Sequence, residues 1–292
     1  MDATTLLITV YCLVDDWLAG RRLRQRGPTP VLSDSEVLTI ECVGEFLGID
    51  TDKGLYEHFR RHYRDWFPAL GRIHRTTFVR QAANLWAVKA QLRQQLLGQV
   101  HFDPQVSILD SFPIPVCRFG RAYRCRRLVE LAAFGRDEGA KQTFYGLRGH
   151  LRICWPGVIC DARLVPANLH DLVMAEELVA GVRGWALGDR AYWSPGRAER
   201  LREQGLELLA PPSRSAKAKV PQLPRWVTPT RRRIETVIGQ LVERYHAKRV
   251  WARDAWHLWS RWLRKLLSHT LAVFLCQRAG LGTLRFADLI TS

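Results

Sequence analysis

Hydrophobic residues recur at helical spacing through the first hundred positions of the chain. Ser33 followed by Glu36 is a capping-box pattern, and it predicts the start of a helix that continues to Leu47. The same spacing of apolar side chains predicts helices over residues 53–66 and 76–97. The pattern therefore predicts an all-helical N-terminal part, and several arginines lie on the outer faces of its helices.

Beyond residue 102 the pattern changes to short apolar runs of strand length. Five strands are predicted, over residues 106–110, 144–154, 157–165, 184–189 and 206–209. Helices are predicted around them, over residues 170–180 and 195–203, from Thr228 onward and over residues 255–277. Three consecutive strands followed by alternating helices and strands indicate a mixed α/β fold, with helices packed on a mixed sheet.

The charge of the chain narrows the choice of partner. Lys and Arg number 44 against 28 Asp and Glu, which gives a net charge of +16. Such a surplus indicates a polyanion, either nucleic acid or an anionic membrane surface. Most of the cations are arginines, whose planar fork matches phosphate. Biased base composition in the coding DNA explains the arginine content equally well.

Membrane and disulfide chemistry are not expected. The apolar run over residues 3–14 is far shorter than the roughly 20 residues that span a bilayer. The seven cysteines are scattered and include no CxxC pair, so neither a disulfide framework nor a zinc site is predicted. We therefore expect a cytoplasmic, nucleoid-associated protein with no membrane partner.

Three carboxylates occupy positions that suit a divalent metal ion. Asp110 and Asp189 each end a predicted strand, and Glu235 lies early in a predicted helix after a basic loop. Mg²⁺ prefers oxygen ligands, and two ions about 4 Å apart can align the attacking and leaving oxygens of a phosphodiester. Taken singly, each acid is better explained by a strand end, a helix cap or an ion pair, and the metal-binding interpretation rests on all three fitting one mixed-sheet topology. Arg231, for example, lies four residues before Glu235 and is a candidate partner.

Five short blocks of sequence accompany these acids in a fixed order. They are Leu109–Cys117, Lys141–Leu151, Val165–Asp171, Leu187–Tyr192 and Arg231–Leu241. Together they resemble the DDE transposases of bacterial insertion sequences, and among these the insertion sequence 982 family. The resemblance covers nearly the whole chain. It implies an RNase H-like mixed β-sheet core flanked by helices and preceded by an all-helical N-terminal domain.

The resemblance also implies the chemistry. Asp110, Asp189 and Glu235 would form the catalytic, metal-binding triad, with two Mg²⁺ ions or Mn²⁺ as a substitute. The reaction would nick the element end and then use the freed 3′-hydroxyl to attack target DNA. The implied partners are double-stranded DNA, namely the terminal inverted repeats and the target, and further copies of the chain in a homo-oligomer on DNA.

Cations around the triad are candidates for phosphate contacts, because residues 211–265 hold far more Lys and Arg than Asp and Glu. Related elements carry a Tyr, Arg, Glu, Lys signature around the last acid. Thr228 and Val242 replace its Tyr and Lys here, so Arg244 or Lys248 is expected to supply the missing cation. The candidate DNA contacts are Lys141, His150, Lys217, Lys219, Arg231, Arg232, Arg233, Arg244 and Lys248.

Two further side chains have purely structural explanations as alternatives to a functional role. A histidine packed against a strand is as good an interpretation of His150 as a phosphate contact. Asp171 is better explained as an acid in the first turn of a helix than as a fourth metal ligand.

We predict three domains: a helical DNA-binding domain over residues 1–102, an RNase H-like DDE catalytic domain over residues 103–254, and a C-terminal helical extension over residues 255–292. The predicted function is a transposase that cleaves and joins DNA at insertion-sequence ends. Two alternatives remain open. One is an RNase H-like nuclease that cuts without joining, and the other is a domesticated DNA-binding protein without catalysis.

Overall fold

The computed structural model describes residues 1–23, 27–213 and 222–289. The chain divides into two compact units. The helical unit comprises Met1–Val100, Leu241–Ala247 and Trp251–Ser292, and the sheet unit comprises His101–Gln240 and Lys248–Val250. The C-terminal helices thus belong to the same unit as the N-terminal ones, while the three-domain division stays a prediction. Across the described ranges, no helix combines the length and apolar character needed to span a membrane.

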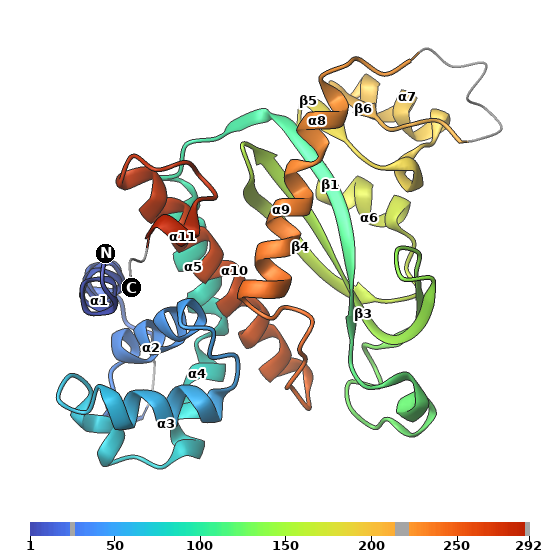
Figure 1. Cartoon of the computed structure of the whole chain (residues 1–292). Coiled ribbons are helices and arrows are strands. Elements are labelled where there is room, and N and C mark those ends of the chain that lie inside the picture. Colours follow the sequence, from blue (N-terminus) through green and yellow to red (C-terminus); the bar gives the residue numbers. More distant parts are fainter. Residues whose placement is uncertain (24–26, 214–221, 290–292) are drawn as a thin grey trace. The chain divides into compact units, whose positions relative to one another are not determined.

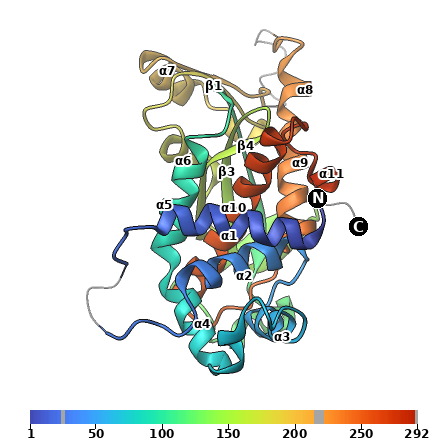
Figure 2. The ribbon, with the colours of Figure 1, turned by 90° about the vertical axis from the view of Figure 1, so that its left-hand side faces the viewer.

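The regular secondary structure in the described residues of the first unit is helical (Figure 2). They are α1 (Ala3–Leu18), α2 (Asp34–Phe46), α3 (Asp52–His62), η1 (Pro68–Gly71), α4 (Arg75–Asn84), α5 (Trp86–Leu97), α10 (Ala255–Arg278) and α11 (Phe286–Leu289). The predicted capping box is confirmed, because the Ser33 hydroxyl accepts a hydrogen bond from the Glu36 N–H at 3.1 Å and the Glu36 carboxylate accepts one from the Ser33 N–H at 2.6 Å. The single helix predicted over residues 76–97 is wrong, since the chain breaks at Leu85 between α4 and α5.

A network of buried charges joins α2, α3, α5 and α10. The Lys89 ammonium lies 2.6 Å from the Glu41 carboxylate, and both side chains are almost completely buried. The Arg264 guanidinium contacts the carboxylates of Glu45 at 2.6 Å and Asp52 at 2.9 Å. Arg264 belongs to the basic stretch over residues 211–265 from which DNA contacts are expected. Because it is buried among acids, it neutralises the interior of the helical unit instead.

A mixed sheet of six strands forms the second unit (Figure 1). Its strands are β1 (Asp103–Pro115), β2 (Ala133–Asp137), β3 (Gln142–Trp155), β4 (Val158–Pro166), β5 (Gly184–Leu187) and β6 (Leu206–Leu209). The strand order is β2-β3-β1-β5-β6, and β4 also pairs with β3. Strands β2, β1 and β4 run antiparallel to β3, whereas β5 runs parallel to both β1 and β6. The predicted mixed α/β fold is confirmed.

Two strands differ from their predictions. Strand β1 continues to Pro115 instead of ending at Asp110, because its antiparallel pairing with β3 persists as far as the pair Pro115 and Gly146. Strand β2 has the sequence Ala-Phe-Gly-Arg-Asp, which contains no β-branched residue and so gives little strand signal. It forms because β3 offers a pairing edge over this length.

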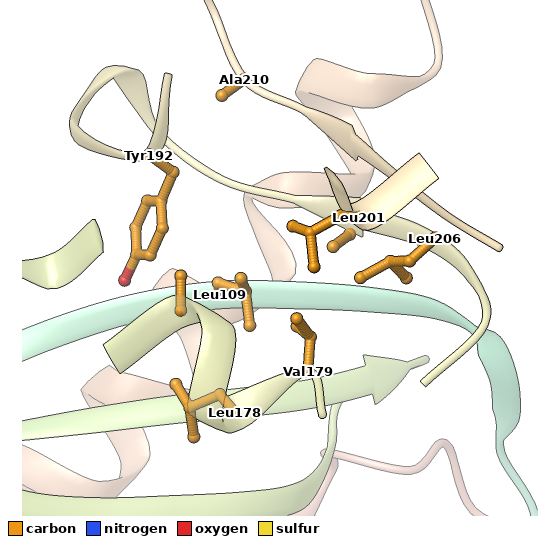
Figure 3. Close-up of a cluster of buried hydrophobic side chains, with 9 residues drawn as sticks. Leu109, Leu178, Val179, Tyr192, Leu201, Leu206 and Ala210 are labelled. Carbon is orange, nitrogen blue, oxygen red and sulfur yellow. The ribbon is translucent and has the colours of Figure 1, made fainter. Parts of the chain in front are cut away.

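Helices pack on this sheet and include α6 (Asp171–Leu178), α7 (Pro195–Glu203), α8 (Val227–Arg231) and α9 (Arg233–Gly239). Shorter turns are η2 (Phe119–Arg124) and η3 (Arg190–Tyr192), and a π-helical segment, η5 (Gln240–Arg244), follows α9. Leu178 of α6 and Leu201 of α7 join Leu109 of β1 in one buried cluster (Figure 3). Helix α9 packs against β1. The helix predicted to begin at Thr228 begins at Val227 and is interrupted at Arg232.

Candidate functional site

Asp110 and Asp189 lie beside each other because strands β1 and β5 pair in parallel. The register places Ile108 of β1 opposite Leu187 of β5. Asp110 and Asp189 are each two residues further along, and neighbouring strands lie about 4.8 Å apart. The parallel pairing therefore brings together two carboxylates that are far apart in the sequence.

The Asp110 carboxylate is held in a largely buried position. Its Oδ1 accepts a hydrogen bond from the Ser111 N–H at 2.8 Å. The pKa of Asp110 is raised to about 6, mainly by burial and also by the negative charges of Asp189 and Asp171, against the lowering effects of the Ser111 hydrogen bond and of Arg231. A carboxyl group in this setting gains from any cation that binds beside it.

Asp189 follows β5 by two residues and begins the turn η3. Its Oδ1 accepts a hydrogen bond from the Ala191 N–H at 2.8 Å, which fixes the orientation of the carboxylate. Gly188 precedes it for a steric reason. A Cβ atom at this position would lie 2.6 Å from Cβ and 2.7 Å from Cγ of Tyr192, so only glycine leaves room for the tyrosine.

Tyr192 connects the acids to the core. Its side chain is 1% exposed and belongs to the cluster around Leu109, with its ring directed from η3 toward β1 (Figure 3). Burial raises its pKa well above the ordinary value, and the charges of Asp171, Asp110 and Asp189 add to the effect. Its hydroxyl has no hydrogen-bond partner among the residues that the structure describes. The Tyr192 hydroxyl is therefore a polar group near the acids that is able to form a further hydrogen bond.

Glu235 lies in the first turn of α9, which is fixed to the sheet by the buried side chains of Ile234 and Val237. Its own side chain is 62% exposed, and one carboxylate oxygen lies 3.8 Å from the Arg231 guanidinium. The ion pair suggested by their spacing is therefore present. Since Arg231 also lowers the pKa of Asp110, this arginine links the third acid electrostatically to the first.

A second set of polar side chains contacts Asp171, the first residue of α6. The Ser111 hydroxyl donates a hydrogen bond to Asp171 Oδ1 at 2.8 Å, and the Arg148 guanidinium lies 3.4 Å from the same oxygen. Successive strand residues face opposite sides of a sheet, so Ser111 and Asp110 point to opposite faces of β1. Asp171 thus contacts the residue next to Asp110 from the other face. Neither Ser111 nor Arg148 was singled out from the sequence, although each lies in one of the five blocks.

His150 lies on the same face as Ser111, with which it pairs across β1 and β3. It is completely buried, and its Nδ1 lies 3.6 Å from Asp171 Oδ1. Burial lowers the pKa of His150 to about 4, so its ring is neutral at pH 7. This position matches the strand-packed interpretation, and the DNA contact stays a prediction.

The other candidate cations are dispersed. Lys141 is exposed in the turn before β3, nine residues ahead of His150, which corresponds to about 30 Å along the strand. The structure therefore does not bring Lys141 to the acids. Arg244 belongs to the helical unit, where its guanidinium lies 6.0 Å from the ring centroid of Phe46.

Three cations of the sheet unit remain on or near its surface. Arg232 and Lys248 are exposed, and the Arg233 guanidinium lies 5.3 Å from the ring centroid of Trp155. The predicted contacts Lys217 and Lys219 lie outside the described residues.

The donor chemistry of the acids fits a divalent cation in part. Asp110 and Asp189 offer adjacent carboxylates, which are the ligands that Mg²⁺ prefers. The third predicted ligand, Glu235, pairs with Arg231 instead. Within the described ranges no group of three or more His, Cys, Asp and Glu side chains is arranged to hold a metal ion. The structure thus brings together two of the three carboxylates of the predicted triad.

Comparison with known proteins identifies the sheet unit. A family model described as a transposase DDE domain matches residues 102–250, which include all three acids. A cryo-EM structure of the piggyBac transposase synaptic complex with hairpin DNA aligns with 11% identity and a TM-score of 0.48, over 99% of this chain and 79% of that one. Comparison with curated proteins gives no match. Because the family model spans more than half of the chain, the protein belongs to the family of transposases with a DDE domain.

Proposed function

We propose that the protein cleaves and joins DNA at the ends of an insertion sequence, as the resemblance to the insertion sequence 982 family implies. The observation that carries the proposal is the parallel register of β1 and β5, which makes Asp110 and Asp189 neighbours inside the DDE domain. The antiparallel pairings among β1–β4, followed by the parallel pairings of β5 with β1 and β6, support an RNase H-like core. No ordinary stability argument calls for two adjacent carboxylates at a sheet, since each raises the cost of burying the other.

We propose that Asp110 and Asp189 hold divalent metal, Mg²⁺ or Mn²⁺ in two sites, with Glu235 as the remaining ligand. Bound divalent ions activate the attacking oxygen and stabilise the leaving oxygen of a phosphodiester. The chain itself orients the ligands, because the N–H groups of Ser111 and Ala191 fix the two aspartates. Glu235 would be able to bind metal once its weak ion pair with Arg231, at 3.8 Å, is broken.

Double-stranded DNA is the proposed substrate, both as terminal inverted repeats and as target, and it is bound by a homo-oligomer of the chain. Arg231 and its neighbours Arg232 and Arg233 would then contact phosphate next to the acids. An arginine freed from Glu235 by metal binding gains a new anionic partner in the DNA backbone.

The test is a reaction of the purified full chain with Mg²⁺ and a plasmid that carries the DNA flanking its coding region. We expect cleavage at short inverted repeats and joined products, and we expect both to disappear in the Asp189→Asn variant. Asp161→Asn is a matched control, because Asp161 is a partly exposed strand residue of the same unit that pairs with Arg163 at 3.1 Å. Cleavage that survives in Asp189→Asn would refute the proposal.

The products also separate the alternatives. Cuts that never give joined ends would favour a nuclease of the same fold. Salt-sensitive DNA binding that ignores both divalent metal and the loss of Glu235 would favour a DNA-binding protein without catalysis.

A further inference from the structure

A basic segment follows β1 directly and covers residues 116–132. It is fixed to the sheet at its start, where the Val116 N–H donates to the Tyr145 carbonyl at 3.0 Å and the Arg127 guanidinium donates to the Val116 carbonyl at 3.2 Å. Its interior side chains Ala122 and Leu128 are buried. The segment is therefore a packed part of the sheet unit, and its exposed side chains are presented on a fixed support.

Aromatic rings extend outward from this support. Phe134 of β2 lies on the buried Tyr145, with ring centroids 5.1 Å apart. Tyr123 lies 5.1 Å from Phe134, and Phe119 meets Phe134 edge-on at 6.4 Å. The exposed fractions rise outward, from 38% for Phe134 through 48% for Phe119 to 85% for Tyr123. Three adjacent rings are thus left with free faces, although burying them would be favourable.

Arginines accompany Phe119 and Tyr123 along the same segment. The exposed arginines of the segment are Arg118, Arg121, Arg124 and Arg126. None of them has a salt-bridge partner among the residues described, and residues 117–129 contain no Asp or Glu. We call the three rings and these four arginines the aromatic–arginine platform. Its charge favours an anionic partner, and its exposed rings favour a partner with flat apolar faces.

Unpaired nucleotides meet both requirements. In a duplex the faces of the bases are covered by their neighbours, whereas an unpaired base can stack on an aromatic side chain while its phosphate contacts arginine. We propose that the aromatic–arginine platform binds unpaired nucleotides of the DNA strand that leaves the catalytic acids. The inference rests on the proposed function, because DNA cleavage at Asp110 and Asp189 is what would supply such a strand.

The length of β1 between Asp110 and the platform sets how many unpaired nucleotides the DNA must have to reach the platform. Asp110 and Pro115 are five residues apart on this strand, or about 17 Å. The platform begins beyond Pro115, where β1 ends. Stacked nucleotides advance about 3.4 Å each, so about five unpaired nucleotides are needed to reach it.

The test measures DNA binding by the full chain in EDTA, by fluorescence anisotropy. The probes are duplexes of the DNA flanking the coding region, either blunt or with unpaired thymidine tails of three or nine nucleotides. We expect the nine-nucleotide tail to lower Kd about tenfold relative to the blunt duplex, the scale of one stacked base, and the three-nucleotide tail to have no effect. The Tyr123→Ala variant should lose this preference and keep the wild-type affinity for blunt DNA.

Two matched variants make the result specific. Tyr123→Trp should retain the preference, because it preserves an aromatic face. Val129→Ala, at a 58% exposed position of the same segment, should behave as the wild type. A tail preference that survives in Tyr123→Ala would overturn the proposal, as would an equal loss of affinity for blunt and tailed DNA. Loss of a dimer in Tyr123→Ala, with DNA binding unchanged, would instead identify a protein interface and also overturn it.

The result of this binding test can be distinguished from the result of the cleavage test of the proposed function. Binding is measured without divalent metal, so a tail preference that depends on Tyr123 supports the platform even where cleavage survives in Asp189→Asn. Cleavage that depends on Asp189, together with a tail preference that ignores Tyr123, refutes the platform alone.

Discussion

Replacing Asp110 by asparagine is expected to stabilise the metal-free protein. Burial and the charges of Asp189 and Asp171 raise the pKa of Asp110 from 3.8 to about 6 in the folded protein. Between these two values the folded protein retains a proton that the unfolded chain has lost. The stability of the wild type therefore falls as pH rises through this window. The shift of about two units corresponds to about 3 kcal/mol at neutral pH.

The asparagine variant removes the charge and retains the shape. Its amide oxygen can still accept the Ser111 N–H, so the variant should gain up to about 3 kcal/mol at pH 7.5 and show a flatter stability profile between pH 4 and 6. Asp103→Asn is the matched control, because Asp103 is an exposed residue of the same strand that accepts the Gln105 N–H at 2.8 Å.

Calorimetric unfolding in EDTA across pH 4–7.5 provides the measurement. The reasoning is refuted if Asp110→Asn is no more stable than the wild type at pH 7.5, or if its profile between pH 4 and 6 has the wild-type slope. A gain of the same size in Asp103→Asn would attribute the effect to net charge instead of to the buried site.

Two other substitutions test packing and buried charge. Gly188→Ala should lower the free energy of unfolding by about 1–3 kcal/mol through its clash with Tyr192, whereas Gly196→Ala, where an added Cβ meets nothing within 4 Å, should not. Equal effects in urea unfolding would contradict the steric role of Gly188. Lys89→Met should cost about 3–5 kcal/mol because it removes the nearer cation of the buried Glu41 carboxylate, which keeps only Arg264 at 3.6 Å. Lys53→Met, at an exposed helix pair, should change stability by less than about 1 kcal/mol, and a comparable loss there would argue against the buried network.

Local patterns predicted the local elements well. The capping box at Ser33 and the strands β3 and β4 are predicted correctly because their signals lie within a few residues of one another. The break at Leu85 and the strand β2 are not predicted, since no Gly or Pro marks the first and the second depends on pairing with β3. Tertiary context overrides propensity at β2.

In the candidate site, too, local sequence patterns are predictable, whereas contacts between distant residues are not. The three acids are predicted from their positions at strand ends and in a helix, and the resemblance to insertion-sequence transposases implies their role. The parallel register of β1 and β5 makes two of them neighbours. The contact between Ser111 and Asp171, sixty residues apart, could not be read from either sequence block alone. Arg264 was expected to belong to a basic DNA-facing stretch, yet it pairs with acids more than two hundred residues away. Charge counted along the chain does not reveal which cations are already neutralised.

Metal binding by Glu235 is the most direct test of the proposed triad, because this side chain pairs with Arg231 in the metal-free protein. Electron paramagnetic resonance of free Mn²⁺ during titration of the full chain measures the affinity. We predict that Asp189→Asn and Glu235→Gln each bind Mn²⁺ at least about tenfold more weakly than the wild type, since even residues that only hold ligands in place are worth about 10–100-fold. Asp161→Asn should bind as the wild type does. Wild-type Mn²⁺ affinity in Glu235→Gln would contradict the assignment of the triad.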